Sequence, residues 1–351
     1  MSVRLEEGLV KKLPLAIACL VFASVTIAPS HRRLLRRVGA ACALIVAFAM
    51  MLLVPPVIRS QPAPRLKSQF KVLPRVTITV LVDNLVADGR VLGEWGLAML
   101  IETGQRRVLF DTGGGRVLAD NARALGVDLS KVDAIVISHG HDDHTAGLSK
   151  ALEATGKTDV FVHPAVFRTA YWKEGSRNVP YTMAVSREHL SMRAQRVVET
   201  AGPTLVTDGI MVTGAIPRVT DFEDTGVTTE AFVDEAMKTP DTVPDDQALF
   251  FRTPEGVVIL LGCGHAGAVN TIHYVSALLG ESRIFAVVGG THLLSASPHR
   301  IQKTGEAFQR YGLQKIMLSH CTGVAAFSSL AAAFLGRCSW PAAGSVIEFK
   351  K

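Results

Sequence analysis

The amino-acid sequence predicts an α/β fold in which helices cover layered β-sheets. Short segments rich in β-branched and apolar residues alternate with helix-like segments from residue 75 to the end of the 351-residue chain. The early strands come in hairpin-like pairs and the later ones alternate with helices, as expected of sheets covered by helices. A composition that is 48% hydrophobic and 19% charged excludes a disordered chain and supplies a large core.

The first predicted strands have clear sequence signals. Residues 75–82 alternate β-branched residues along a single strand. Residues 95–101 and 107–110 form two further strands, and Gly104 between them makes a hairpin the simplest connection. A helix is predicted over residues 118–125, because the next residue is a glycine, a common helix stop.

The rest of the chain from residue 75 continues the same pattern. Residues 132–137 form a nearly continuous apolar run, which predicts a strand buried on both faces. Later strands are predicted at residues 160–163, 210–213, 248–251, 257–261, 284–288, 316–319 and 346–349, and helices at residues 266–279 and 300–311. Residues 164–245 are rich in turn-forming and polar residues, so they predict a lid-like insertion within one domain spanning residues 75–351.

The charges are distributed unevenly along the chain. The formal net charge is +6, yet residues 1–72 hold 11 basic and two acidic side chains, a net of +9. Residues 73–351 hold 26 basic and 29 acidic side chains, a net of −3. Because phosphate binding needs clustered lysine and arginine, nucleic acid is not an expected partner of the domain. A basic start that contains apolar blocks predicts contact with a lipid bilayer instead.

Two charge-free apolar blocks, residues 13–29 and 38–58, are candidate transmembrane helices. We expect residues 1–60 to form a membrane anchor and residues 61–74 a linker. A cleaved signal peptide is the alternative reading, because four arginines precede the second block. An uncleaved anchor of one or two helices is favoured, since no clear small-x-small cleavage site follows.

The position of the arginines also predicts a topology. Arg32, Arg33, Arg36 and Arg37 lie just before the second block, and such clusters favour the cytoplasmic side. The domain is therefore expected on the periplasmic or extracytoplasmic side of an inner membrane, although basic residues on the other flanks dilute the signal. The five cysteines are dispersed and imply no disulfide framework.

The strongest functional signal is the segment Ser138-His139-Gly140-His141-Asp142-Asp143-His144, directly after the predicted strand 132–137. Imidazole and carboxylate groups at the end of a rigid strand are suitable ligands for divalent metals. His139 and His141 are two residues apart, so an extended segment turns both to one side. Asp143 and His144 begin the next turn and can face a second ion, so this loop predicts a site for two metals.

This pattern resembles the signature of the metallo-β-lactamase-fold hydrolases. The segment Leu109-Phe110-Asp111-Thr112-Gly113 is similar to the Asp-Thr-Gly turn of that superfamily. The resemblance covers the chain from about Arg75 to its end and implies a four-layer αββα sandwich. Six segments are similar to a subgroup related to the archaeal dihydropterin-linked aminobenzene phosphate synthase: residues 82–84, 214–218, 245–249, 262–267, 289–293 and 320–323.

The resemblance also implies a ligand set for two divalent ions, with zinc as the first choice and iron or manganese as alternatives. It implies six metal ligands: His139 and His141 for the first ion, Asp143 and His144 for the second, His265 as a further ligand, and His320 to close the second site. The chain departs from the superfamily pattern because no aspartate occurs at the usual position of the metal-bridging carboxylate. Cys263 and His292 are the two candidates for that role, because thiolate and imidazole both bind zinc or iron.

The expected function is a membrane-anchored hydrolase that uses a metal-bound hydroxide on an ester, lactone or phosphoester of a small molecule. Asp143 is expected to orient the nucleophile or accept its proton, and His292 to protonate the leaving group. Asp111 is expected to orient a ligand histidine. Residues 164–245 are expected to set the substrate, and five side chains there can line a pocket: Tyr171, Trp172, Arg177, Tyr181 and Arg218.

Three alternatives remain open. The subgroup resemblance implies a transferase similar to the pterin-linked synthase, which forms a bond instead of hydrolysing one. A redox enzyme is the second, because the same ligand set can hold two irons. A non-catalytic, membrane-tethered sensor with a structural metal site is the third. Neither the substrate nor the oligomeric state can be read from the sequence.

Overall fold

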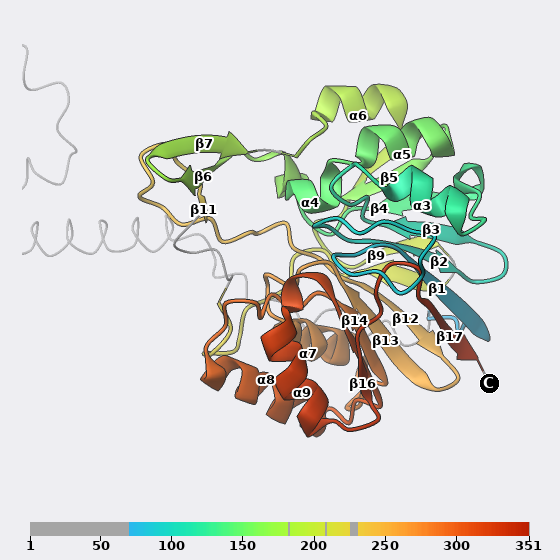
Figure 1. The fold of residues 1–351 in the computed structure, drawn as a ribbon, viewed down its shortest axis with the longest axis vertical. Helices are drawn as coiled ribbons and strands as arrows, with labels where there is room; N and C mark the ends of the chain where they lie inside the picture. Colours follow the sequence, from blue (N-terminus) through green and yellow to red (C-terminus); the bar gives the residue numbers. More distant parts are fainter. Residues whose placement is uncertain (1–69, 182, 208, 225–230, 351) are drawn as a thin grey trace, which may run out of the picture. The chain divides into compact units, whose positions relative to one another are not determined.

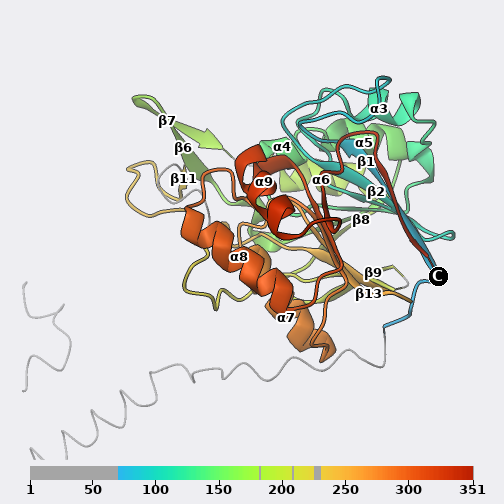
Figure 2. The ribbon, with the colours of Figure 1, turned by 60° about the horizontal axis from the view of Figure 1, so that its bottom comes forward.

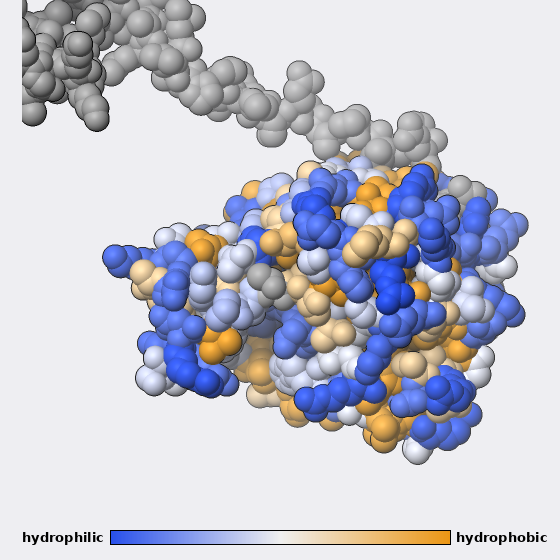
Figure 3. All heavy atoms as spheres, turned by 90° about the horizontal axis from the view of Figure 1, so that it is seen from above, coloured by the Kyte–Doolittle hydropathy of each residue, from blue (hydrophilic) through white to orange (hydrophobic). Residues whose placement is uncertain are grey.

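A computed structural model describes residues 70–181, 183–207, 209–224 and 231–350. The blocks 13–29 and 38–58 that the sequence suggests as transmembrane helices lie outside these residues. None of the helices in the described ranges has both the length and the apolar character needed to span a bilayer. On the face shown in Figure 3, apolar residues are scattered among hydrophilic ones.

The first of two large sheets is built mainly from the first half of the domain. Its strands run in the spatial order β17 (Val346–Lys350), β1 (Arg75–Val82), β2 (Ala98–Glu102), β3 (Arg107–Phe110), β4 (Ala134–Val136), β5 (Asp159–Val162) and β8 (Arg196–Glu199). The strands from β17 to β3 pair antiparallel, and those from β3 to β8 pair parallel. The predicted hairpin of β2 and β3 is confirmed.

The second large sheet has the same mixed construction. Its strands run in the spatial order β16 (Cys338–Ser339), β15 (Lys315–Leu318), β14 (Ala286–Gly289), β13 (Gly256–Leu261), β12 (Leu249–Thr253), β10 (Ile210–Val212) and β9 (Thr204–Thr207). The four strands from β13 to β16 pair parallel, and the others pair antiparallel. Parallel strands end at the same edge of a sheet, so the segments that follow them are brought together.

Helices cover the outer face of each sheet, which gives four layers (Figures 1 and 2). The helices beside the first sheet are α3 (Leu118–Ala124), α4 (Asp142–Thr145), α5 (Leu148–Thr155) and α6 (Arg187–Arg193). Those beside the second sheet are α7 (Ala268–Leu279), α8 (Pro298–Arg310) and α9 (Val324–Ala333). The predicted α/β layering is therefore confirmed.

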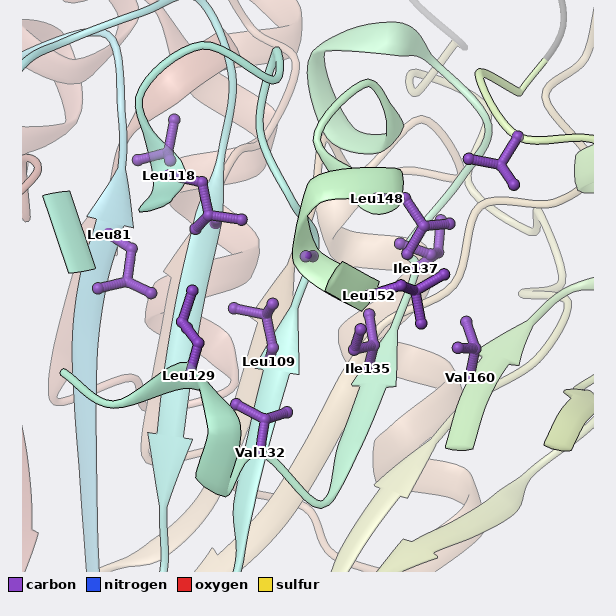
Figure 4. Packing of buried hydrophobic residues seen from close by; sticks show 14 of the residues in the cluster. Leu81, Leu109, Leu118, Leu129, Val132, Ile135, Ile137, Leu148, Leu152 and Val160 are labelled. Atoms are coloured by element: carbon purple, nitrogen blue, oxygen red, sulfur yellow. The ribbon is translucent and has the colours of Figure 1, made fainter. Parts of the chain in front are cut away.

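The core follows the alternation of side chains along each strand. In β2, Met99 and Ile101 face the second sheet, where they pack in a cluster with residues of β12 and β13. Leu100 points the other way, into the cluster under α3 and α5. Figure 4 shows this second cluster, in which Leu148 and Leu152 of α5 lie over the strands. Burial of each large apolar side chain stabilises the fold by about 1.5–3 kcal/mol.

Local sequence signals explain most of the element boundaries. Helix α8 begins after Ser297, whose side chain accepts a hydrogen bond from the Arg300 amide, and α7 ends at Gly280 in the left-handed conformation. The predicted strand 95–101 begins late, at Ala98, and Gly96 ahead of it is closely packed. A Cβ atom on Gly96 would lie 2.6 Å from the Asp143 carbonyl oxygen.

Residues 164–245, suggested by the sequence as one insertion, contribute to all three sheets. Strand β8 is an edge of the first sheet, and β9 and β10 lie at the edge of the second. The segment that projects from the four layers is a small antiparallel sheet, β11 (Ala231–Phe232), β6 (Ala170–Glu174) and β7 (Arg177–Tyr181). The short polar strands 196–199 and 204–207 lack the apolar runs that would have marked them as sheet members.

Candidate metal centre

The histidine-rich segment lies at the carboxyl end of β4, where the sequence places it. The chain bends at Ser138 and Gly140, and His141 is the N-cap of α4, the short helix that carries Asp143 and His144. Residues from the second sheet meet this loop: Cys263 and His265 follow β13, His292 follows β14, and His320 follows β15. All of these strands belong to the parallel halves of the two sheets, so their ends converge.

The convergence places potential metal donors close together. One group consists of Asp143, His144, Cys263 and His320, and within it the nearest donor atoms all lie within 4.8 Å of one another. Two further groups at the same spacing are His139 with His141 and Asp143, and His139 with Cys263 and His265. All six ligands implied by the resemblance are therefore brought into one cluster, and the Cys263 sulfur belongs to two of these groups.

The donor set fits one or more divalent metals. The Nε2 atom of His139 and the Nδ1 atom of His292 are buried with no hydrogen-bond partner. Buried polar atoms are normally satisfied, so unmet ring nitrogens at a cluster of imidazole, carboxylate and thiol groups indicate a ligand. Neutral imidazole, carboxylate and thiolate are all ligands of zinc, and they also suit iron.

Asp111 makes hydrogen bonds that orient residues of the donor cluster. Its Oδ2 atom lies 2.7 Å from Nδ1 of His144 and accepts a 2.7 Å hydrogen bond from the Ser138 hydroxyl. The Ser138 hydroxyl is also 2.9 Å from Nδ1 of His139. Because the Nδ1 atoms of His139 and His144 take part in these contacts, the Nε2 atoms of both rings face the donor cluster. The expected orienting role of Asp111 toward a ligand histidine is supported by this contact.

A second set of contacts positions His320. Its Nδ1 atom is 3.0 Å from Oδ1 of Asn84, and its backbone amide donates a 2.9 Å hydrogen bond to Asp83. The indole of Trp340 donates to the other oxygen of Asp83 at 2.9 Å. These contacts leave Nε2 of His320 at 3.1 Å from Oδ2 of Asp143.

The backbone at the centre is strained. Among the residues that the structure describes, five other than glycine have positive φ, and Asp111 (60°), His292 (46°) and His320 (53°) are three of them. Such conformations cost about 1–3 kcal/mol each and persist where the surroundings impose them, often at functional sites. At Gly262 no larger residue fits, because a Cβ atom would collide with the Ser138 hydroxyl.

Burial and neighbouring charges set the protonation of the donors. Burial lowers the pKa of His139 well below its usual range, and the neighbouring imidazoles lower it further. Burial alone would raise the pKa of Asp143, but His144 and His320 outweigh it and hold the carboxylate ionised. Burial also opposes a charge on His144, yet Asp143 and Asp111 raise its pKa to about 9. A divalent ion that took His144 as a ligand would therefore have to displace a proton from it.

Two aromatic side chains flank the centre. The half-exposed Trp95 ring lies 5.2 Å from the ring of His320. On the other flank, the Tyr181 hydroxyl at the end of β7 is 3.5 Å from Nε2 of His141. The projecting sheet of β6, β7 and β11 thus reaches the metal-binding loop through Tyr181.

A buried ion-pair network fixes the Tyr181 hydroxyl in place. It donates a 2.9 Å hydrogen bond to Asp241, which is fully buried and is held at 2.7 Å by the Arg168 guanidinium. Arg168 also pairs with Asp245, and the other oxygen of Asp245 accepts a 2.7 Å hydrogen bond from the Gly140 amide. The network therefore joins the projecting sheet to the loop between His139 and His141.

Several of these residues carry no functional signal in the sequence. Arg168 and Asp241 are separated by 72 residues of loops and short strands, so only the folded chain brings them together. Trp95 falls at the start of a predicted strand. His163, another strand-end histidine, accepts a hydrogen bond from the Ala165 amide and so caps the following turn.

Comparisons with known proteins agree with this geometry. The model of the metallo-β-lactamase superfamily matches residues 96–278. The chain is 29% identical over 263 residues, 72% of its length and 90% of the relative's, to the 7,8-dihydropterin-6-methyl-4-(β-D-ribofuranosyl)-aminobenzene-5′-phosphate synthase of Methanocaldococcus jannaschii. It is also 30% identical over 259 residues, 72% of its length and 93% of the relative's, to an uncharacterised protein of the same organism.

Similarity to a solved structure agrees with the same assignment. A crystal structure described as a metal-dependent hydrolase of the β-lactamase superfamily matches 79% of this chain and all of its own, with a TM-score of 0.67 and 29% sequence identity. Members of this superfamily bind divalent metals, and the donor cluster of this chain lies at the strand ends described above. The chain belongs to the metallo-β-lactamase superfamily.

Proposed function

We propose that this protein is a hydrolase that holds two divalent metal ions, zinc in the first instance, in the donor cluster at the strand ends. One observation carries the proposal: donors from both sheets meet with their nearest atoms within 4.8 Å of one another. The relation to a structure described as a metal-dependent hydrolase supports the same reaction class.

The donor groups overlap in space, since His139 and Asp143 each belong to two of them. In this proposal His139, His141 and His265 would hold the first ion, and Asp143, His144 and His320 the second. Cys263 lies between them, because its sulfur is grouped with His139 and His265 on one side and with Asp143, His144 and His320 on the other. Its sulfur would be a ligand available to both ions, in a chain that lacks the aspartate of the wider superfamily.

Bound divalent ions would supply Lewis acidity, which makes a water nucleophilic at neutral pH and polarises the oxygen of the bond to be broken. The protein's own groups would handle the protons. Asp143, which is held ionised by its imidazole neighbours, accepts the proton of the attacking water. His292, whose ring lies 4.2 Å from that of His265, donates a proton to the leaving group.

His292 suits an acid role in its surroundings. Burial lowers its pKa, but contact with Cys321 raises the pKa above the usual value for histidine. The ring is half-buried at the edge of the cluster, so it can reach both the ions and a bound molecule. The substrate proposed is a small molecule with an ester, lactone or phosphoester bond, lying between Trp95 and Tyr181.

The reaction class can be tested by removing and restoring the metal. Protein stripped with a chelator is assayed on a phosphoester, a lactone and a carboxyl ester, then reloaded with Zn²⁺, Mn²⁺ or Fe²⁺ and assayed again. Activity is expected only in the reloaded samples, to be lost in His139→Ala, and to be kept in His299→Ala, which changes an exposed histidine of α8. Undiminished hydrolysis by the metal-free protein would contradict the proposal.

A synthase is the second candidate, because a relative 29% identical over 90% of its own length is named as one. Such an activity would use the same ions to activate a phosphorylated substrate for bond formation. The two candidates are separated by product analysis: a hydrolase yields products that incorporate oxygen from ¹⁸O-labelled water, whereas a synthase joins two substrates without that label.

We also propose that residues 1–60 attach the protein to a membrane, on the basis of the apolar blocks 13–29 and 38–58 and the arginines between them. The full chain is expected in the membrane fraction after carbonate washing, and a chain that begins at residue 61 in the supernatant. Recovery of the full chain in the supernatant would contradict this attachment.

A further inference from the structure

Two cysteine thiols lie side by side at the centre, and the proposed reaction uses only one of them. The donor atoms of Cys263, Cys321 and His292 lie within 4.8 Å of one another. The Cys321 thiol also points at the Cys263 carbonyl oxygen, at 3.5 Å. Both residues are almost fully buried. Cys338, the third cysteine within the described ranges, lies on β16 and belongs to none of the donor groups found there.

The approach of these two thiols depends on a glycine between them. Cys263 follows β13 and Cys321 follows β15, strands that flank β14 and are therefore about 10 Å apart in the sheet. Gly290 directly follows β14, the strand between them. A Cβ atom on Gly290 would lie 2.6 Å from the Cys321 sulfur and 3.3 Å from Cα of Cys263. The absence of a side chain at this position is what lets the two cysteines meet.

The geometry favours bond formation with a small rearrangement. A disulfide needs a sulfur–sulfur distance of about 2.05 Å, so the two sulfurs need to approach by less than ~3 Å from their present spacing. Gly264 and Gly323 lie one and two residues from the cysteines, and both have positive φ, a backbone conformation that glycine adopts without strain. The proposed reaction already requires water at this place, and hydrogen peroxide is only slightly larger.

We propose that Cys263 and Cys321 are a reversible oxidation site at which a peroxide forms an intramolecular disulfide that disassembles the metal centre. One thiolate attacks a peroxide oxygen, which gives a sulfenic acid and releases hydroxide. The second thiol attacks the sulfenic sulfur and expels its hydroxyl group as water. Overall, two thiols and one hydrogen peroxide become one disulfide and two waters, and a dithiol reductant reverses the change.

The effect on the metals follows from the position of Cys263. Its sulfur is shared by the donor groups on both sides of the cluster, so a disulfide there removes a thiolate ligand from both ions at once. This consequence rests on the proposed function, whereas disulfide formation itself does not. Oxidation is therefore expected to release metal as well as to stop turnover.

The experiment treats the full chain, loaded with zinc, with increasing hydrogen peroxide and then with dithiothreitol. Peptide mapping under denaturing conditions identifies which of the five cysteines are joined, and a chromogenic chelator measures released zinc. The expected result is a Cys263–Cys321 disulfide that forms in step with zinc release, with both reversed by reductant and added zinc. Cys338→Ser should respond as the unmodified chain does.

The Cys321→Ser variant tests the second thiol directly. Its zinc release should become irreversible, because the Cys263 sulfenic acid has no partner and oxidises further to the sulfinic acid. The inference is overturned if zinc release occurs with both thiols still reduced, or if Cys321→Ser recovers fully with reductant. Mapping on metal-free protein separates the two proposals: a Cys263–Cys321 disulfide that forms there, in a protein that shows no hydrolase activity even after zinc is restored to the reduced chain, contradicts only the proposed function.

Discussion

The Oδ2 atom of Asp111 and the Nδ1 atom of His144 lie 2.7 Å apart with both side chains fully buried. The contact crosses from the end of β3 to the short helix α4, so it joins the turn after one strand to the metal loop after the next. A carboxylate in this position fixes both the tautomer and the ring orientation of a ligand histidine.

Replacing this carboxylate should weaken metal binding. Asp111→Asn removes the charge that holds the His144 ring while keeping the shape, and a loss of metal affinity of about 10- to 100-fold is expected. Competition with a chelator of known affinity measures it. Asp120→Asn, an exposed carboxylate change on α3, should leave the affinity unchanged. Equal affinities for the two variants would show that Asp111 has no such role.

Cys263 should control how many ions are bound. Cys263→Ala removes the sulfur shared by both sides of the cluster, so the metal content of the purified protein should fall below that of the unmodified chain. Cys263→Asp restores an anionic ligand at the same place and should recover part of the content. Elemental analysis by mass spectrometry gives the stoichiometry, and Cys338→Ala is the control. If Cys263→Ala keeps its full metal content, the bridging role is wrong.

We expect Tyr181 to contribute to activity by its position beside the centre and not by binding a metal ion. Tyr181→Phe removes the hydrogen bond to Asp241, and bonds to a charged partner contribute about 1.5–3 kcal/mol. A decrease of about tenfold in kcat/KM with unchanged metal content is therefore expected. Tyr171→Phe, on β6 of the same small sheet, is the matched control. If Tyr181→Phe also loses metal, then Tyr181 instead helps to maintain the metal centre.

Asp246 should make the metal-free protein less stable as the pH rises. Burial raises the pKa of this carboxyl from 3.8 to about 7, although the Ala266 amide and Arg218 act in the opposite direction. The folded state then holds the proton more tightly than the unfolded state. The stabilisation is fully present below pH 3.8 and is lost as the pH rises toward 7, with a difference on the order of 4 kcal/mol.

This pH dependence can be isolated by comparison with Asp246→Asn. Urea unfolding of both chains at several pH values should show the unmodified protein losing stability relative to the variant between about pH 4 and 7. A constant difference across this range would mean that Asp246 is not protonated in the folded state.

The sequence identified most of the fold because its strands have strong local signals. The β-branched run of β1 has the predicted bounds, and the apolar strands β13, β14 and β15 differ from their predicted positions by one or two residues at either end. The edge strands β8 and β9 were missed, because short half-exposed strands at a sheet edge have no apolar run. Helix α9 was missed as well, since only two of its ten residues are buried and its composition gives no amphipathic pattern.

The candidate site was predictable only as far as strand ends could be recognised. His139, His141, Asp143 and His144 lie in one segment, and the later histidines follow apolar strands, so their meeting could be expected. The sequence offered no basis for ranking Cys263 against His292, because both follow neighbouring strands. In the structure Cys263 belongs to donor groups on both sides of the cluster, and His292 to one group, with Cys263 and Cys321. The Arg168–Asp241 pair had no signal, because it depends on loop positions and not on local sequence.

The metal donors come from both large sheets, one set preceding residue 145 and the other following residue 262. Under the proposed assignment each ion takes ligands from both halves of the domain, so full loading would require the segments after β13 and β15 to have docked. A chain truncated before His265 would lack a ligand of each ion. Metal content would then indicate completed folding and could be used to distinguish native protein from partly assembled forms.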